Sequence, residues 1–223
     1  FNAIKTLLRL SLHRLEPRRP LIAQAPSTAS DMDWDTYWLN AQQRRPGLYD
    51  LIAEFYRRYL ISPAAAAILS QHLPDGLNRH YLHAGCGSGG SNLRLRLRNA
   101  QVHALDLSFV ALRLNRSRRL PFASWHVCAD LFRLPYASGT MDGVFNFGVM
   151  EHFDGPGIEQ ILAEIHRVLK PTGRVILFWP PEFGLSVLGL KVITRLANRF
   201  RKIPLKLHPD ECSRIQSFPW IRS

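Results

Sequence analysis

Four glycines stand within six residues of one another in the stretch YLHAGCGSGGSN, at Gly85, Gly87, Gly89 and Gly90. Glycine has no Cβ, so its backbone can take conformations closed to other residues and can approach a bound molecule closely. The loop follows a short apolar run, which places it at the carboxyl end of a strand, where nucleotide-like ligands bind in α/β proteins. Gly85, Gly87 and Gly90 fit the dinucleotide pattern GxGxxG. Gly85, Gly87 and Gly89 fit the tighter GxGxG, so the glycines alone leave both open.

Asp106 is the next acidic residue after the glycines, and it ends the second apolar run of this part of the chain. An ionised carboxylate at that position can accept hydrogen bonds from both hydroxyls of a ribose, in either glycine pattern. The alternative is a helix cap at the end of a strand.

The elements that would position these groups follow a regular alternation. Residues 158–170 have apolar side chains at helical spacing, and other helical segments separate short apolar runs. Strands alternating with helices predict an α/β fold in which helices cover both faces of a mostly parallel, doubly wound sheet. The runs that fit buried strands are 81–84, 102–107, 126–129, 143–148 and 174–179.

Three further segments are predicted to be helical. Residues 48–61 form one helix, and 62–73 form another, with Ser62 as its cap and Pro63 at its first position. The alternating stretch LRLRLR, 93–98, looks like an exposed strand, but a crossover between two parallel strands favours a short helix there.

The composition is that of a globular protein, with 46% apolar and 21% charged residues among 223, and no apolar run approaches the ~18 residues of a membrane span. The net charge of +12 can attract nucleic acid, anionic lipid or an acidic substrate. The arginines are scattered over several helical segments, which favours solvated helix faces over a dedicated nucleic-acid surface.

The cysteines Cys86, Cys128 and Cys212 are odd in number and widely spaced, which argues against disulfides and for a reducing compartment, the cytoplasm. They form no CxxC pair, and the nine histidines form no ligand cluster with them, so no metal is predicted. Cys86 lies inside the glycine loop, where it is either a reactive thiol or a small residue that fits.

The two ends of the chain differ from its middle. Residues 1–30 are basic, with apolar residues at helical spacing followed by a linker. They fit an ordinary amphipathic appendage, a helix in peripheral contact with a membrane, or a mitochondrial transit peptide. Residues 31–75 read as a helical cap, 76–181 as the core, and 182–223 as a helical extension.

Five motifs occur in order along the core: HAGCGSG, ALDLS, CADLFRLPY, MDGVFNFGVMEHF and LKPTGRV. Together they resemble the class I S-adenosylmethionine-dependent methyltransferases, in particular the small-molecule branch that includes the ubiquinone and menaquinone biosynthesis enzymes. The resemblance covers a little under half of the chain. It implies a Rossmann-like fold, S-adenosylmethionine as cofactor and a small-molecule methyl acceptor.

The resemblance also implies roles for particular residues. Asp106 would bind the ribose hydroxyls, Asp130 the adenine amino group, and Asn146 would border the methionine moiety. Alternatively, Asp130 could be a cap at the end of a strand. Asn146 could merely contact a neighbouring loop. The full candidate cofactor-binding set is His83, Gly85, Cys86, Gly87, Gly89, Asp106, Leu107, Asp130, Leu131, Asn146, Phe147 and Gly148.

Two features depart from that family. His83 stands where the family often has an acid that orients the cofactor's ammonium group, although a neutral imidazole can still accept one hydrogen bond. The family's sheet usually ends in an antiparallel hairpin, and residues 182–223 show no convincing pair of strands, so the hairpin is expected to be missing or the chain truncated.

Methyl transfer needs donor and acceptor to be aligned and water to be excluded, and only a hydroxyl or phenol acceptor needs a base. His152 is the better candidate base and Glu151 the second, and each could instead be a packing residue. The aromatic residues Trp34, Tyr37 and Trp38 either cover the cofactor or pack on the sheet. Trp179, with Pro180 and Pro181, would line the acceptor pocket.

Three functions remain after this comparison. A small-molecule methyltransferase is favoured. The positive charge suggests an RNA-directed methyltransferase. His83 and the unusual C-terminal segment suggest a methyltransferase-like binding module that has no catalytic activity. An NAD-dependent dehydrogenase fits the glycines but not the later motifs.

Overall fold

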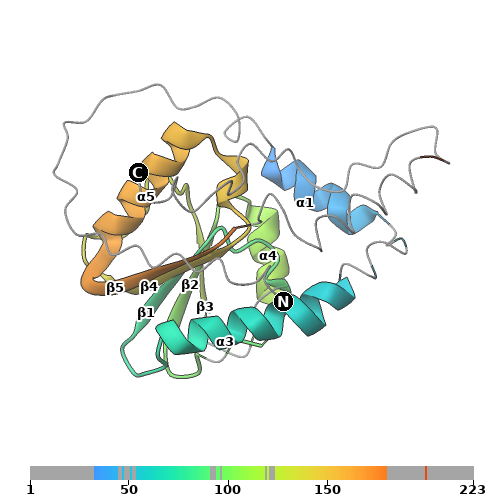
Figure 1. Ribbon diagram of the computed structural model, residues 1–223. Helices are drawn as coiled ribbons and strands as arrows, with labels where there is room; N and C mark the ends of the chain where they lie inside the picture. The colour runs from blue at the N-terminus through green and yellow to red at the C-terminus, as the bar shows by residue number, and fades with distance from the viewer. Residues whose placement is uncertain are drawn as a thin grey trace.

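The computed structural model describes residues 33–44, 47, 51, 54–90, 94–95, 97–118, 120, 124–179 and 199. A five-stranded sheet lies at the centre, with helices on both of its faces (Figure 1). Its strands run in the order β3-β2-β1-β4-β5, and every pair is parallel. They are β1 (His80–Ala84), β2 (Gln101–Asp106), β3 (Ser124–Cys128), β4 (Met141–Phe147) and β5 (Leu169–Phe178).

The predicted doubly wound, Rossmann-like sheet is therefore confirmed, and each of the five apolar runs overlaps a strand. The runs are mostly apolar because helices cover both faces of a parallel sheet. Since all five strands point the same way, the residues that follow β1, β2, β3 and β4 meet at one edge.

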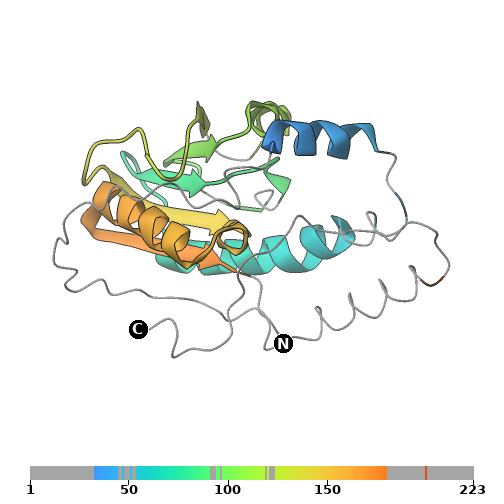
Figure 2. The same cartoon turned by 90° about the horizontal axis from the view of Figure 1, so that it is seen from above.

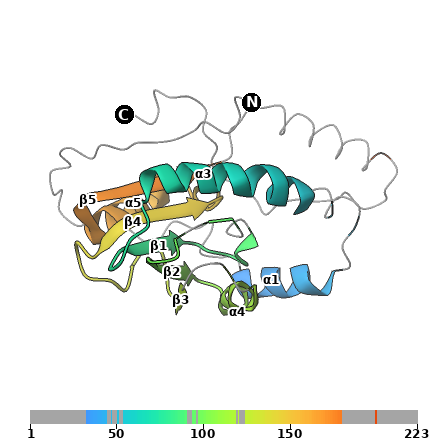
Figure 3. The same ribbon diagram turned by 90° about the horizontal axis from the view of Figure 1, so that it is seen from below.

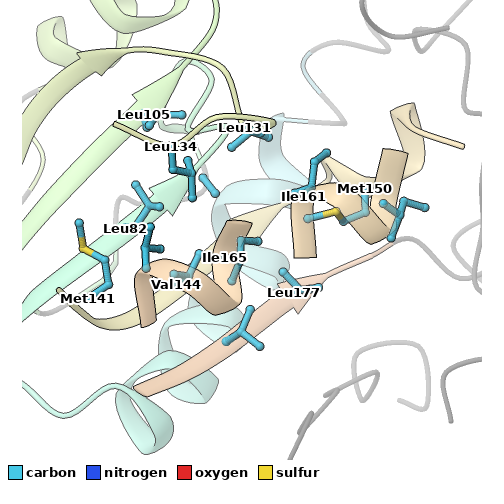
Figure 4. Packing of buried hydrophobic residues seen from close by; sticks show 14 of the residues in the cluster. Leu82, Leu105, Leu131, Leu134, Met141, Val144, Met150, Ile161, Ile165 and Leu177 are labelled. Carbon is cyan, nitrogen blue, oxygen red and sulfur yellow. The ribbon is translucent and has the colours of Figure 1, made fainter. Parts of the chain in front are cut away.

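Helix α5 (Gly155–Val168) covers one face of the sheet. Asp154 caps it by accepting a hydrogen bond from the Gly157 amide at 2.9 Å. Ile161 and Ile165 pack against Val144, among other apolar side chains of the sheet (Figure 4). The helix was predicted for 158–170, but it ends at Val168 and β5 begins at the next residue, because the residue before a proline such as Pro171 favours extended backbone.

Helix α3 (Ser62–His72) covers the opposite face, where Leu69 packs among buried residues that include Tyr81 and Phe145 (Figure 3). A π-helical turn, Arg57–Ile61, leads into α3 without a break. Ser62 is therefore not the predicted cap: its backbone is helical, and its amide donates to the carbonyl of Arg57, five residues earlier. A wider turn just before Pro63 suits a residue that has no amide hydrogen to donate.

The helix predicted for 93–98 is wrong within the part of that segment that the structure describes, 94–95 and 97–98. Leu95 and Leu97 are 2% and 0% exposed and belong to the same buried cluster as Val102. Residues two apart lie on opposite sides of a helix but on the same side of an extended chain. The described residues of this segment are not helical, and Leu95 and Leu97 both lie in the core.

Helix α1 (Trp34–Gln43) lies beside α4 (Phe109–Ser117), the helix that follows β2 (Figure 2). No helix within the described ranges is long and apolar enough to cross a membrane. The predictions for 1–30 lie outside the described residues. So do those for 182–223 apart from Arg199, including the expected absence of a hairpin.

Candidate functional site

The glycine loop after β1 has the conformation that only glycine adopts readily. Gly85, Gly87 and Gly89 have φ angles of 68°, 50° and 72°. A side chain in that region is strained by about 1–2 kcal/mol. Gly90 does not have a positive φ, and a Cβ there would meet nothing closer than Arg118 at 3.9 Å, so no close packing requires a glycine at this position. The backbone therefore favours the GxGxG pattern over the dinucleotide pattern.

Each of the three glycines lies close to a different element, so a side chain at any of these positions would meet a neighbouring residue. A Cβ on Gly85 would stand 2.6 Å from Cγ2 of Val149, and one on Gly87 would stand 3.1 Å from the Trp38 ring. A Cβ on Gly89 would stand 2.8 Å from Nδ2 of Asn115. The loop is a bare backbone surface enclosed by the β4 end, by α1 and by α4.

Asp106 lies directly beside this loop. Its Oδ2 accepts a hydrogen bond from the Gly87 amide at 2.7 Å, and its Oδ1 accepts one from the Ser108 amide at 2.9 Å. Burial raises the pKa of Asp106, while these backbone donors act in the opposite direction. An ionised carboxylate can accept about four hydrogen bonds, and the backbone amides of Gly87, Ser108 and Leu107 use only part of that capacity.

Helix α1 is joined to this site by a residue that the sequence analysis missed. Oδ1 of Asp35 accepts hydrogen bonds from the Ser108 hydroxyl at 2.5 Å and from the Val110 amide at 3.2 Å. Asp35 thus reinforces the start of α4, where Ser108 is already the N-cap. A contact across 73 residues of sequence leaves no local pattern by which it could have been found.

The aromatic residues of α1 lie over the loop and over the turn after β4. Trp38 contacts Gly87, and the ring of Trp34 meets the ring of His152 edge-on, with their centroids 5.2 Å apart. Tyr37 packs edge-on against both tryptophans, at 5.8 and 5.3 Å. The structure therefore brings His152, a candidate base, together with α1 at the same edge of the sheet as the glycines.

Asn115 is a second residue that the sequence analysis missed. It is buried on α4, and its Nδ2 donates to the Gly87 carbonyl at 3.2 Å. Its Oδ1 lies 3.2 Å from Nε2 of His126 on β3. Asn115 therefore fixes the glycine loop against α4 through its hydrogen bond to Gly87. Only the fold shows that α4 lies beside this loop.

The candidate adenine-binding residues follow β3 and β2. Asp130 is exposed, and its Oδ1 accepts a hydrogen bond from the Phe132 amide at 3.0 Å, which forms a local turn. Leu131 is buried in the core cluster, whereas the Leu107 side chain is about half exposed. The adenine role of Asp130 stays a prediction, and its Oδ2 accepts no hydrogen bond from the described part of the chain.

The end of β4 contains a buried amide that lacks the expected partners. Asn146 is 0% exposed, and neither its Oδ1 nor its Nδ2 has a hydrogen-bond partner within the described ranges. Leaving a buried polar group unsatisfied costs about 1–3 kcal/mol, so such a group commonly marks a ligand site. Two residues on, Gly148 has a φ of 68°, which turns the chain away from β4. Phe147, by contrast, stacks on Phe178 at 4.7 Å.

Cys86 has the environment of a packing residue. It is buried in a small cluster with Ala104 and Leu112, and burial raises the pKa of its thiol far above the usual range. A thiol that stays protonated is a poor nucleophile. Of the two interpretations of Cys86, the structure favours the small residue that fits the loop.

His83 is enclosed by aromatic rings. It is 2% exposed and stacks on Phe145 with a centroid distance of 4.6 Å, while Phe147 meets it edge-on at 5.5 Å. Burial lowers its pKa from 6.5 to about 3, so the imidazole is neutral at physiological pH. His83 therefore brings no charge to the site.

This burial predicts a pH-dependent stability. With a pKa of about 3 in the folded protein and 6.5 when unfolded, His83 takes up a proton preferentially in the unfolded chain, so stability is lost as the pH falls below 6.5. Between pH 7.5 and 5.5, wild type should lose about 1.4 kcal/mol more unfolding free energy than His83→Phe. Urea unfolding at both pH values measures this difference. Equal losses in the two proteins would show that His83 does not titrate in this way.

Comparison with known proteins adds to this geometry. Residues 82–177 match a family model described as a methyltransferase domain. A malonyl-(acyl-carrier protein) O-methyltransferase of Laribacter hongkongensis is 35% identical over 179 residues, which are 75% of this chain and 56% of that protein. The biotin biosynthesis bifunctional protein BioHC of Cellvibrio japonicus is 30% identical over 161 residues, 72% of this chain and 29% of that protein. The chain thus spans about half or less of these relatives.

Among solved structures, a geranyl diphosphate C-methyltransferase from Streptomyces coelicolor A3(2), in complex with S-adenosyl-L-homocysteine, matches with a TM-score of 0.43. It is 21% identical, and the match covers 58% of this chain and 50% of that one.

Proposed function

Residues 82–177 are a methyltransferase domain of the class I, S-adenosylmethionine-dependent family, and from this premise we propose that the protein methylates an ionised carboxylate on a malonyl-type acyl chain. The proposal of methyl transfer is supported by one observation. The glycine loop lies directly beside Asp106, whose Oδ2 accepts a hydrogen bond from the Gly87 amide at 2.7 Å. The acceptor is proposed from the relatives described above and from the chemistry of the site.

The residues present fit the cofactor. The positive φ angles of Gly85 and Gly87 let the loop turn sharply beside Asp106, whose remaining acceptor capacity would suit the ribose hydroxyls. Asp130 would accept from the adenine amino group. The unsatisfied amide of Asn146 suits the polar methionine end.

When bound, S-adenosylmethionine supplies a methyl group already activated by a positively charged sulfur. The work left to the chain is to hold the acceptor oxygen in line with that methyl group and to exclude water. A carboxylate is ionised at neutral pH and is itself the nucleophile, so its methylation needs no general base. His152 or Glu151 would act as a base only if the acceptor were a hydroxyl group.

A negatively charged acceptor also agrees with the charge of the chain. The net charge of +12 attracts anions and raises their rate of encounter. An acyl chain ending in a carboxylate is such an anion, and the Laribacter relative is named for a malonyl group on an acyl-carrier protein. The RNA acceptor and the membrane contact considered from the sequence have no support in the described geometry or in these relatives.

The proposal is tested by following a labelled methyl group from S-adenosylmethionine into malonyl-acyl-carrier protein. We expect a base-labile methyl ester to form, and none to form when the malonyl carboxylate is already esterified. Malonyl-coenzyme A in a parallel assay shows whether the carrier protein is needed. Equal labelling of the blocked substrate, or no labelling of any malonyl thioester, would reject a carboxylate acceptor.

His152→Ala discriminates between the two kinds of acceptor. With a carboxylate we expect kcat to fall less than about 10-fold, with no inflection of the pH–rate profile near pH 6–7. With a hydroxyl that needs a base, kcat should fall by about 10²–10⁴. Steady-state kinetics from pH 5.5 to 8.5 on both proteins measures this. A fall of the larger size, without a change in cofactor affinity, would contradict the proposed acceptor.

A further inference from the structure

The methionine end of S-adenosylmethionine carries an ammonium group, and burying a cation is costly unless an anion or several acceptors face it. In the proposed site this end would lie where the carboxyl ends of β1 and β4 meet. These two central strands are neighbours, with His83 opposite Phe145. On the β1 side, His83 is neutral and enclosed by aromatic rings, so it supplies no negative charge.

A carboxylate is present on the β4 side. Glu151 lies in the short 3₁₀ turn Met150–His152 and is 7% exposed, the only acidic residue counted as buried within the described ranges. Acidic side chains are almost never fully buried unless they are paired.

The backbone makes room for this carboxylate. Oε1 of Glu151 lies 2.8 Å from the place where a Cβ on Gly148 would stand, so any larger residue there would displace it. Gly148 also has a φ of 68°, and its amide donates to the Phe178 carbonyl at 2.9 Å, which fixes the turn onto β5. The Glu151 carboxylate is therefore set against the bare Cα of Gly148 at the end of β4.

The same turn touches the glycine loop. Cγ2 of Val149 lies 2.6 Å from the place of a Cβ on Gly85, so the chain just before Glu151 packs directly on the start of the loop. The unsatisfied side-chain amide of Asn146 lies one residue before the end of β4. A carboxyl group, an amide and bare backbone thus lie at the carboxyl ends of β1 and β4, a combination that fits the polar end of an amino acid.

We propose that the Glu151 carboxylate binds the ammonium group of the cofactor's methionine moiety, and so supplies the negative charge that His83 does not. This inference rests on the proposed methyltransferase function. It gives Glu151 a binding role and not the role of a base. It also explains how a chain with a neutral residue at the end of β1 can hold a cationic cofactor.

The experiment compares two ligands that differ in the methionine end. S-adenosylhomocysteine carries the ammonium group, and 5′-methylthioadenosine lacks the whole amino-acid portion. Calorimetry on Glu151→Gln should show affinity for S-adenosylhomocysteine reduced by about 10- to 100-fold, the scale of a lost hydrogen bond to a charged group. Affinity for methylthioadenosine should stay within about 2-fold of wild type, because that ligand does not reach Glu151.

Glu159→Gln is the matched control, since it removes the same charge from an exposed position on α5. It should change neither affinity. An analogue of S-adenosylhomocysteine that lacks only the α-amino group isolates the ammonium group: wild type should bind it more weakly than the parent ligand, and Glu151→Gln should bind the two alike. If Glu151→Gln does not fold, Glu151→Asp replaces it and should retain part of that preference.

Unchanged affinity for S-adenosylhomocysteine in Glu151→Gln would overturn the inference, as would an equal loss for both ligands, which would indicate a structural role. These outcomes leave the proposed function standing, because wild type still binds S-adenosylhomocysteine. If wild type binds neither ligand, the proposed function itself fails and the inference fails with it.

Discussion

Gly87→Val is expected to reduce binding of S-adenosylhomocysteine by at least about 100-fold while the sheet remains folded. Gly87 has a φ of 50°, and a Cβ there would stand 3.1 Å from Trp38, so a branched side chain has no room unless α1 moves. A side chain there would push the Trp38 ring, and with it α1, away from the loop that the proposed site uses. Calorimetry measures the affinity, and circular dichroism reports whether the fold is kept.

Gly139→Val is the matched control for backbone strain. Gly139 has a φ of 69°, and a Cβ there would meet nothing within 4 Å. The control should therefore lose stability, through the same unfavourable conformation, without losing affinity. Normal binding by Gly87→Val would show that the loop is only a turn, and parallel losses of affinity in both variants would show that strain alone explains the effect.

Asp106→Ala is expected to weaken binding of S-adenosylhomocysteine by about 1.5–3 kcal/mol, or about 10- to 150-fold. The substitution removes the acceptors proposed for the ribose hydroxyls. It also removes the oxygens that hold the amides of Gly87 and Ser108, so the loop loses its anchor. Titration calorimetry with S-adenosylhomocysteine and with adenosine should show losses of similar size, because both ligands contain the ribose.

Asp142→Ala controls for the loss of a backbone-holding carboxylate. Asp142 lies at the opposite end of β4, where it accepts from the His80 amide at 2.9 Å and pairs with Arg79 and Lys170. Its replacement should lower the unfolding temperature and leave affinity unchanged. If Asp106→Ala also changes only the unfolding temperature, Asp106 is a structural residue and not part of the site.

The presence of the strands and their parallel direction could be predicted from the sequence because they depend on short-range patterns, whereas the order β3-β2-β1-β4-β5 came only from the structure. Runs such as 143–148 and 174–179 are mostly apolar, and helical spacing in 158–170 separates them, which favours parallel strands covered on both faces. Their carboxyl ends then share an edge, so the grouping of the glycine loop with Asp106 follows from the topology. Where local patterns conflicted, as in 93–98, the expected topology overrode the alternation and the prediction was wrong.

Only the tertiary structure decided which chemistry each of these positions can support. Positive φ angles select Gly85, Gly87 and Gly89 over Gly90, and they depend on how the loop is held between α1, α4 and the β4 end. The contact of Asp35 with Ser108 joins segments far apart in the sequence. The neutral state of His83 is a consequence of burial among side chains from other strands. Burial, distance and charge state are set by neighbours in space, whereas a single sequence records only neighbours along the chain.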